Sequence, residues 1–332
     1  MSVRVAVLQG GVSAEREVSL VSGGAVAEAL RAEGFRVHAI DAHPSTVERD
    51  VRGLAPDVVF NALHGDWGED GGVQRILDPL GVPYTHSGAE SSRLAMDKDA
   101  TKQVLARHGV NVARGTTLPR AEVARGGAMP VPYVVKPNGS GSSSSVYLVH
   151  RETPELLAQM GADEGLGAEP VVERYIPGRE LTVAVMDGRA MAVTEIVPRG
   201  WYSFEEKYGE GAAAHVLPAK LPPEVARLCM DWAETAHRAL GCSGLTRTDF
   251  RYDDTDQGTQ DNTQNGTSPQ LSSASTAMAN RVVTLELNTQ PGMTPTSLAP
   301  EQAAWCGLSF GELCRWIVED ALCRTRSGGS AP

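Results

Sequence analysis

Alternation of strands and helices in the first ninety residues most limits the fold of this chain. Short apolar runs have the length and composition of buried strands, at residues 3–8, 37–40 and 58–60. Residues 15–32 repeat apolar side chains at helical spacing and stop at Gly34, and a second helical stretch covers 73–80. Strands that alternate with helices form a parallel sheet. We therefore predict an N-terminal α/β domain over residues 1–95.

The pattern changes after residue 95, where a helix over 97–109 is expected. Two short apolar runs then bracket a Gly/Ser stretch and predict a β-hairpin, and a helix and a strand complete a small α+β domain over 96–178. Four apolar strands and three helices predict a third α+β domain over 179–325. Since 332 residues exceed one compact core, three domains fit the length.

Residues 254–280 are polar and low in complexity. Such a stretch cannot bury enough apolar surface to offset its ordering entropy. We predict a disordered insertion between two paired strands of the third domain.

Composition and charge exclude several classes of partner. The formal net charge is −11 and no Lys/Arg run occurs, which argues against nucleic acid and against a membrane surface. No apolar run approaches the roughly 20 residues of a membrane span. The five cysteines form no C-x-x-C pair, so neither a disulfide framework nor a zinc site is expected. With no signal-like start, these features favour a reducing cytoplasm.

Lysine is rare in this chain, with five residues among the 30 basic ones: Lys98, Lys102, Lys136, Lys207 and Lys220. In an arginine-rich chain, a lysine can mark a place that needs a compact point charge, such as a phosphate contact. We attribute Lys102 and Lys220 to chance.

The stretch VVKPNGSGSSSSV at 134–146 is the first candidate for chemistry. Small residues let backbone N–H groups approach phosphate oxygens, and Lys136 supplies charge at the base of the loop. It is not a Walker A loop, because G-x-x-x-x-G-K-[ST] is absent. By itself this pattern is more typical of a flexible hairpin tip.

Two apolar strands that carry acids are the second candidate. Along a strand, residues i and i+2 face the same side, so Glu286 and Asn288 point together, and so do Arg247 and Asp249. Two carboxylates and an amide oxygen are the hard ligands that suit Mg²⁺ bridging phosphates. The alternative is two solvated strand faces, which acids on apolar strands make less attractive.

A glycine turn followed by a helix start is the third candidate. The segment GGVSAEREVS places Glu15 near the helix N-terminus, where the helix dipole favours a carboxylate. Capping of the helix by Ser13 explains the same residues equally well.

The order and spacing of seven motifs resemble those of D-alanine–D-alanine ligases, members of the ATP-grasp superfamily. The motifs are GGVSAEREVSL, NALHGDWGEDG, AMDKDATK, VVKPNGSGSS, VVERYIPGRELTVAV, GLTRTDFR and ELNTQPGMTPTSL. The resemblance runs from about residue 3 to 321 and breaks only at 254–280. It implies an ATP-grasp fold in which the second and third domains sandwich ATP. It also implies a homodimer, and ATP-dependent joining of two D-alanines through an acylphosphate for peptidoglycan synthesis.

The resemblance also assigns residues to the nucleotide. Phosphate contacts would come from Lys98, Lys136 and Lys207, and Ser142 of the Gly/Ser loop would also contact the nucleotide. Adenine would lie against Glu173 and the backbone of Arg174 to Ile176, with the ribose hydroxyls on Glu180. Two Mg²⁺ ions, or alternatively Mn²⁺, would be held by Asp249, Glu286 and Asn288.

The substrate residues follow from the same resemblance. Glu15 would hold the ammonium of the first D-alanine, hydrogen-bonded to Ser142 and Tyr208, with His64 nearby. The N–H of Gly292 and the side chain of Arg247 would stabilise the oxyanion. Ser297 and the Leu298 N–H would receive the carboxylate of the second D-alanine. Residues 200–209 resemble the mobile loop of the family, in which Tyr208 closes over the substrates and the Lys-Tyr pair favours a dipeptide product.

Three details depart from the family pattern: the loop tip GSSSSV, the Asp66-Trp67 pair, and His86 at a position where glycine is usual. His86 is expected to crowd its turn. Two other functions fit the sequence. One is another carboxylate–amine or depsipeptide ligase on the same scaffold, and the other is an inactive nucleotide-binding regulator.

Overall fold

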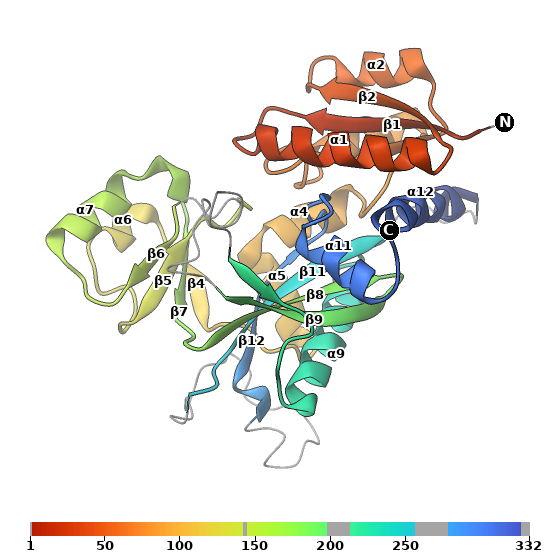
Figure 1. The fold of residues 1–332 in the computed structure, drawn as a ribbon. Coiled ribbons are helices and arrows are strands. Elements are labelled where there is room, and N and C mark those ends of the chain that lie inside the picture. The colour runs from red at the N-terminus through yellow and green to blue at the C-terminus, as the bar shows by residue number, and fades with distance from the viewer. Residues whose placement is uncertain (1, 142–144, 198–212, 256–277, 327–332) are drawn as a thin grey trace.

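A computed structural model describes residues 2–141, 145–197, 213–255 and 278–326 of the chain (Figure 1). The N-terminal region contains a three-stranded parallel sheet in the order β2-β1-β3, from β1 (Arg4–Gly10), β2 (Arg36–Ala42) and β3 (Val58–Asn61). The long helix is α1 (Arg16–Ala32), and shorter helices follow at α2 (Val47–Leu54), α3 (Gly72–Leu77), η1 (Asp78–Leu80) and α4 (Ala89–Met96). This is the parallel α/β domain predicted from the strand and helix spacing.

The central region is a four-stranded antiparallel sheet in the order β4-β7-β5-β6. Its strands are β4 (Gly115–Thr117), β5 (Tyr133–Lys136), β6 (Tyr147–Val149) and β7 (Val171–Arg174). The predicted hairpin is confirmed, because β5 and β6 pair antiparallel. Helix α5 (Lys98–Arg107) leads into this region, which also contains α6 (Arg120–Val123), α7 (Pro154–Ala162) and η2 (Glu164–Leu166).

The C-terminal region contains a five-stranded antiparallel sheet in the order β10-β9-β8-β11-β12. Its strands are β8 (Arg179–Met186), β9 (Arg189–Val197), β10 (Ala214–Val216), β11 (Leu245–Tyr252) and β12 (Val282–Asn288). Helix α9 (Pro223–Ala239) packs its apolar face on β8, β9 and β11. The remaining helices are α11 (Leu298–Trp305), which packs against β8 and β9, and α12 (Phe310–Arg326).

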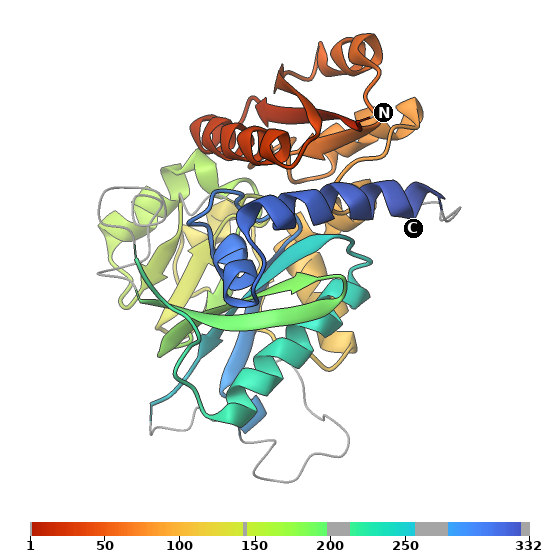
Figure 2. The same ribbon diagram turned by 45° about the vertical axis from the view of Figure 1, so that its right-hand side comes forward.

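One hydrophobic core joins the N-terminal and C-terminal regions. Helix α12 lies between them (Figures 1 and 2) and packs Leu313, Ile317 and Val318 against apolar residues of β1, β3 and α1. The same cluster continues into β8, β11 and α11. The N-terminal sheet is therefore anchored on the body that carries the other two sheets.

The longer predicted elements are confirmed, with ends that differ by a few residues. The elements without a prediction are short: α2, α4, α6, η2, β4 and β10. Of the expected insertion, residues 256–277 lie outside the described residues. Residues 278–279 form part of a helical turn, and Met278 packs against the core under α9. Within the described ranges, no helix combines the length and apolar character that a membrane crossing requires.

Candidate active site

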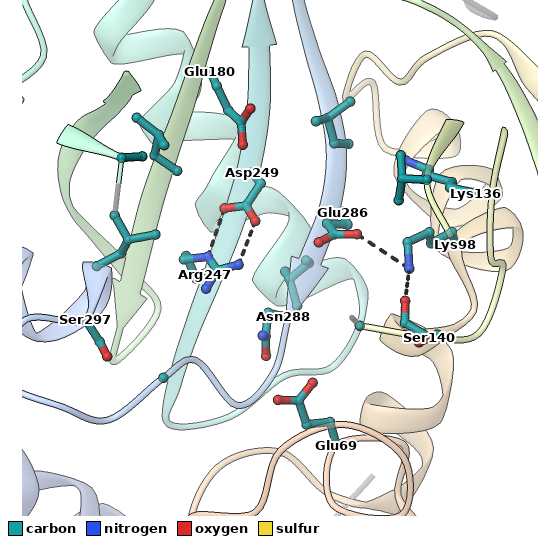
Figure 3. A pocket seen from close by; sticks show the side chains of 18 of the residues that line it. Glu69, Lys98, Lys136, Ser140, Glu180, Arg247, Asp249, Glu286, Asn288 and Ser297 are labelled. Carbon is teal, nitrogen blue, oxygen red and sulfur yellow. Dashed lines mark hydrogen bonds and ion pairs between the residues drawn. The ribbon is translucent and has the colours of Figure 1, made fainter. Parts of the chain in front are cut away.

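A cavity of about 1470 Å³ lies between the three sheets and receives side chains from all three regions. Its lining includes Glu15 from the start of α1, Lys98 from α5 and Lys136 from β5. The C-terminal sheet contributes β11 and β12. The cavity is therefore the place where candidates from distant parts of the sequence meet (Figure 3).

The acidic residues of β11 and β12 face each other across the strand pair. Antiparallel register sets Asp249 opposite Glu286 and Arg247 opposite Asn288. Arg247 donates from Nε to Asp249 Oδ1 at 2.9 Å and from Nη2 to Oδ2 at 2.7 Å. The hydroxyl of Thr182 on β8 also donates to Asp249 Oδ1, at 2.6 Å. These bonds fix the carboxylate of Asp249 at the floor of the cavity.

The donor set of β11 and β12 fits a hard divalent cation that also binds phosphates. Among the residues that the structure describes, no three His, Cys, Asp or Glu side chains gather closely enough to hold an ion by themselves. Mg²⁺ at nucleotide sites, however, uses one or two carboxylates and takes its other ligands from phosphates and water. Asp249, Glu286 and the amide oxygen of Asn288 meet that requirement, and all three line the cavity.

Positive charge lies opposite this acidic pair. Lys98 Nζ is 3.5 Å from Glu286 Oε2 and donates to the carbonyl of Ser140 at 2.7 Å (Figure 3). Lys136 Nζ is 2.6 Å from Glu173 Oε1. Both ammonium groups thus stand at the base of the Gly/Ser loop and face the strands that carry the acids, which is the arrangement that a polyphosphate bridged by metal requires.

Burial and neighbouring charges set the protonation of these lysines. Burial lowers the pKa of Lys98, although Glu286 opposes the change. Burial also disfavours the charged form of Lys136, but Glu173 and Glu286 outweigh it and raise the pKa of Lys136. The Glu173 carboxyl is buried too, yet Lys102 and Lys136 lower its pKa. Lys136 and Glu173 therefore form a charged pair beneath the loop.

The prediction that Lys102 occurs at its position by chance is wrong. Its ammonium group is buried and forms an ion pair with Glu173 Oε2. Lys102 lies one helical turn after Lys98 on α5, so both side chains reach the same side. That i, i+4 spacing is the signal that could have identified it. Both oxygens of Glu173 are held by lysines, so this carboxylate positions Lys136 whatever else it contacts.

Glu15 lies at the opposite end of the cavity and is 7% exposed. It is the N-cap residue of α1, without a side-chain capping bond. Ser13 is not the N-cap residue, but its Oγ accepts from the backbone N–H of Glu15 at 3.2 Å and donates to the carbonyl of His64 at 2.6 Å, so it does bind a backbone donor at the helix start. The Glu15 carboxylate thus lines the cavity at a helix start, where the helix dipole favours negative charge.

His64 and Glu69 form a second buried pair beside Glu15. His64 Nδ1 is 3.0 Å from Glu69 Oε1, and Nε2 is 3.1 Å from Ser22 Oγ. Glu69 had not been identified from the sequence, since loops have no periodicity to mark it. It faces the Gly/Ser loop, because a Cβ on Gly141 would lie 3.1 Å from Glu69 Oε2. Figure 3 shows Glu69 pointing towards the space below Asn288.

The start of α11 also lines the cavity. Ser297 is the N-cap residue, and its side chain does not cap the helix. Instead Ser297 Oγ contacts Thr294, at 3.1 Å from N and 2.8 Å from Oγ1. A Cβ on Gly292 would lie 3.0 Å from Ser297 Oγ, so glycine leaves room there. N–H groups at a helix start are suited to bind a carboxylate.

The cavity brings together every predicted site residue that the structure describes. Arg174, Ile176 and Glu180 form part of its wall, at the crossing from β7 to β8. Ser142, Lys207 and Tyr208 lie outside the described residues, so their predicted roles stay predictions.

An expected departure from the usual pattern is also visible in the structure. His86 adopts φ 66°, in the left-handed region that favours glycine. Burial, reinforced by the charge of Arg324, lowers the pKa of His86 to about 3. His86 is therefore a neutral histidine between the N-terminal and C-terminal regions.

Two antiparallel sheets that enclose a cavity with lysines on one wall and acids on the other define the ATP-grasp class. A family profile described as "D-ala D-ala ligase C-terminus" matches residues 106–280. The chain belongs to the D-alanine–D-alanine ligase family.

Full-length relatives agree with this assignment. The chain is 50% identical over 323 residues to a D-alanine–D-alanine ligase of Cereibacter sphaeroides, covering 96% of both chains. It is 51% identical over 322 residues to one from Dinoroseobacter shibae, covering 97% of this chain and 96% of the relative. A crystal structure of the Bacillus anthracis D-alanine–D-alanine ligase complexed with ATP superposes with a TM-score of 0.76, at 27% identity. That match covers 99% of this chain and 100% of the other.

Proposed function

We propose that this chain joins two D-alanines into D-alanyl-D-alanine, with conversion of ATP to ADP and phosphate, for peptidoglycan precursor synthesis. The observation that carries the proposal is the paired register of Asp249 with Glu286 and of Arg247 with Asn288, facing Lys98 and Lys136 across one cavity. The family membership supports the choice of substrates.

In the first step, a carboxylate oxygen of the first D-alanine attacks the γ-phosphorus of ATP, and the bond to the β-phosphate oxygen breaks. Lys98, Lys136 and Lys207 bind the phosphates and stabilise the charge that builds up on them. Positioning and electrostatic stabilisation supply most of the catalysis in phosphoryl transfer. Mg²⁺, or Mn²⁺, held by Asp249, Glu286 and Asn288 would neutralise phosphate charge when bound.

In the second step, the amine of the second D-alanine attacks the acyl carbon, phosphate leaves, and the nitrogen loses a proton. Arg247 and the Gly292 N–H stabilise the oxyanion that forms on the acyl oxygen. Ser297 and the Leu298 N–H hold the carboxylate of the second D-alanine. Glu15 binds the ammonium of the first, in a network with Ser142 and Tyr208, and His64 and Glu69 support that end of the cavity.

The nucleotide base and ribose lie at the crossing from β7 to β8. The backbone of Arg174 to Ile176 contacts adenine beside Glu173, and Glu180 accepts from the ribose hydroxyls. A nucleotide co-substrate supports a cytoplasmic location. We also propose a homodimer, which sedimentation equilibrium of the purified chain tests.

The test is ATP turnover with Mg²⁺, followed as phosphate release and as dipeptide formation, with D-alanine and L-alanine side by side. We expect turnover with D-alanine and none with L-alanine. Equal activity on both enantiomers would defeat the substrate assignment. A panel of amino acids and hydroxy acids separates this function from another carboxylate–amine or depsipeptide ligase, and absence of all turnover would favour an inactive regulator.

A further inference from the structure

Arg251 lies on the cavity face of β11, two residues beyond Asp249 and four beyond Arg247. Unlike Arg247, it does not bind the acids of the strand pair. Its guanidinium group reaches the chain segment at 175–180, which crosses from β7 of the central sheet to β8 of the C-terminal sheet.

Four contacts join Arg251 to this crossing segment. Nε donates to the carbonyl of Ile176 at 3.1 Å, and Nη2 donates to the carbonyl of Gly178 at 2.8 Å. Nη1 is 3.5 Å from Glu180 Oε2, and the guanidinium carbon is 5.8 Å from the centre of the Tyr175 ring. A guanidinium group has a rigid fork of donors, so contacts along one turn fix the path of that turn.

The crossing segment has little freedom to move away from β11. Gly178 has φ 90°, and a Cβ there would overlap the carbonyl oxygen of Tyr252. The backbone of the segment thus lies directly against the end of β11. Arg251 binds the other side of the same turn, and Tyr175, Ile176, Gly178 and Glu180 all line the cavity.

The position of Glu180 depends on this arrangement. Glu180 pairs with Arg251 in the register of β8 and β11, and its side chain is largely buried beside the guanidinium group. A carboxylate accepts hydrogen bonds from two vicinal hydroxyls most strongly when it is ionised and held in one orientation. Arg251 provides an opposite charge and a rigid donor 3.5 Å from Glu180 Oε2.

We propose that Arg251 is a positioning residue for the nucleoside part of ATP: it aims Glu180 at the ribose hydroxyls and fixes the 175–178 turn against which the base lies. This inference rests on the proposed function, from which it takes that ATP binds in this cavity with its ribose at Glu180 and its base at the backbone of residues 174–176. The four contacts described for the Arg251 guanidinium group all go to residues 175–180 and not to the lysines, acids or helix starts proposed for the phosphates and the amino acids. Loss of Arg251 therefore weakens recognition of the nucleoside and leaves the chemical steps intact.

The experiment compares Arg251→Met and Arg251→Lys with the parent chain in steady-state kinetics. We expect Arg251→Met to raise KM for ATP about tenfold, the effect of losing hydrogen bonds from a charged group, with kcat within about twofold. KM for D-alanine should not change. The preference for ATP over 2′-deoxy-ATP, as a ratio of kcat/KM values, should fall, and Arg251→Lys should restore part of it.

The Glu180→Gln variant tests whether Arg251 acts through Glu180 or independently of it. This variant should lower the same ATP to 2′-deoxy-ATP ratio, and adding Arg251→Met to it should lower the ratio no further, because residues that act as a unit are not additive. Multiplicative losses in the double variant would refute the proposed coupling.

Arg281→Met is the matched control. Arg281 makes contacts of the same kinds, to the carbonyls of Asp253 and Thr255 and to the ring of Tyr252 at 5.5 Å, but it is not part of the cavity lining. Its loss should lower the melting temperature and leave KM for ATP unchanged. If Arg251→Met also lowers only the melting temperature, Arg251 is structural and the inference is wrong.

Direct binding of ATP to the parent chain and variants, by calorimetry without D-alanine, separates this inference from the proposed function. A parent chain that binds ATP but ligates no D-alanine would overturn the function alone. Weaker binding by Arg251→Met would still support the inference in that case, and equal binding would overturn it. If Arg251→Met fails to fold, Arg251→Lys, which keeps the charge but loses the fork, gives the same comparison.

Discussion

We expect acid to lower the free energy of unfolding of this protein because of His86. A substitution of His86 should remove this part of the acid effect. His86 is fully buried and makes an edge contact to the Phe60 ring, with 5.7 Å between centroids. Neither ring nitrogen has a well-aligned hydrogen-bond partner among the described residues. Burial and the charge of Arg324 lower the pKa of His86 to about 3, from an ordinary value of 6.5.

The direction and size of the effect follow from proton linkage. Between pH 6.5 and 3 the unfolded chain binds a proton at His86 that the folded chain does not, so the free energy of unfolding falls as pH falls. One pKa unit corresponds to about 1.4 kcal/mol, so His86 alone should cost about 2 kcal/mol between neutral pH and pH 5. The loss grows further towards pH 3 and then levels off.

The assay is urea denaturation of the parent chain and of His86→Asn at pH 8 and pH 5. Asparagine tolerates the left-handed backbone and stays neutral in acid. Between pH 8 and pH 5, we expect the free energy of unfolding to fall by about 2 kcal/mol more for the parent chain than for the variant. The slope of this free energy against urea concentration should be the same for both proteins.

Phe60→Leu is the control for lost packing. It weakens the same contact without removing a titrating group, so it should lower stability by similar amounts at both pH values. Parallel pH profiles for the parent chain and His86→Asn would refute the reasoning.

Three further outcomes are expected. Glu286→Gln should keep the fold, measured by circular dichroism, and lose most Mg²⁺-dependent ATP turnover with D-alanine; unchanged turnover would rule out its role at the metal. Lys102→Met should cost less in urea denaturation than the about 3–5 kcal/mol of an uncompensated buried charge, because Lys136 still pairs with Glu173; Glu173→Gln, which takes the carboxylate from both buried lysines, should cost more, and the opposite order would contradict this network. Gly292→Ala places a Cβ 3.0 Å from Ser297 Oγ. It should therefore raise KM for the second D-alanine roughly tenfold, equivalent to about 1.4 kcal/mol, and an unchanged KM would contradict a carboxylate site at Ser297.

Strands β11 and β12 were the most predictable part of the candidate site. The two-residue repeat of a strand places Arg247 with Asp249 and Glu286 with Asn288 without any coordinates. Antiparallel pairing of β11 and β12 then brings the two pairs together, as the sequence had indicated. The same four residues are therefore marked by the strand repeat and brought together by the pairing of β11 with β12.

Other features of the site depend on contacts between residues far apart in the chain, which no local sequence pattern predicts. The roles of Glu69 and Arg251 arise where loops and strands from different regions meet, so spacing alone could not reveal them. Short elements such as α2 and β4 hold too few residues for a period to emerge. The domain limits at 95 and 178 stay predictions, since changes in pattern do not show how the segments pack.

The C-terminal helix has a consequence for how this chain can be divided. Because α12 covers apolar residues of α1 and the parallel sheet, the first hundred residues rely on the last twenty described ones for part of their core. A fragment that stops before Phe310 would retain all the strands and still expose the apolar face of the N-terminal region that α12 covers. Exchange of this N-terminal region between homologous enzymes should therefore succeed only when the terminal helix is transferred with it.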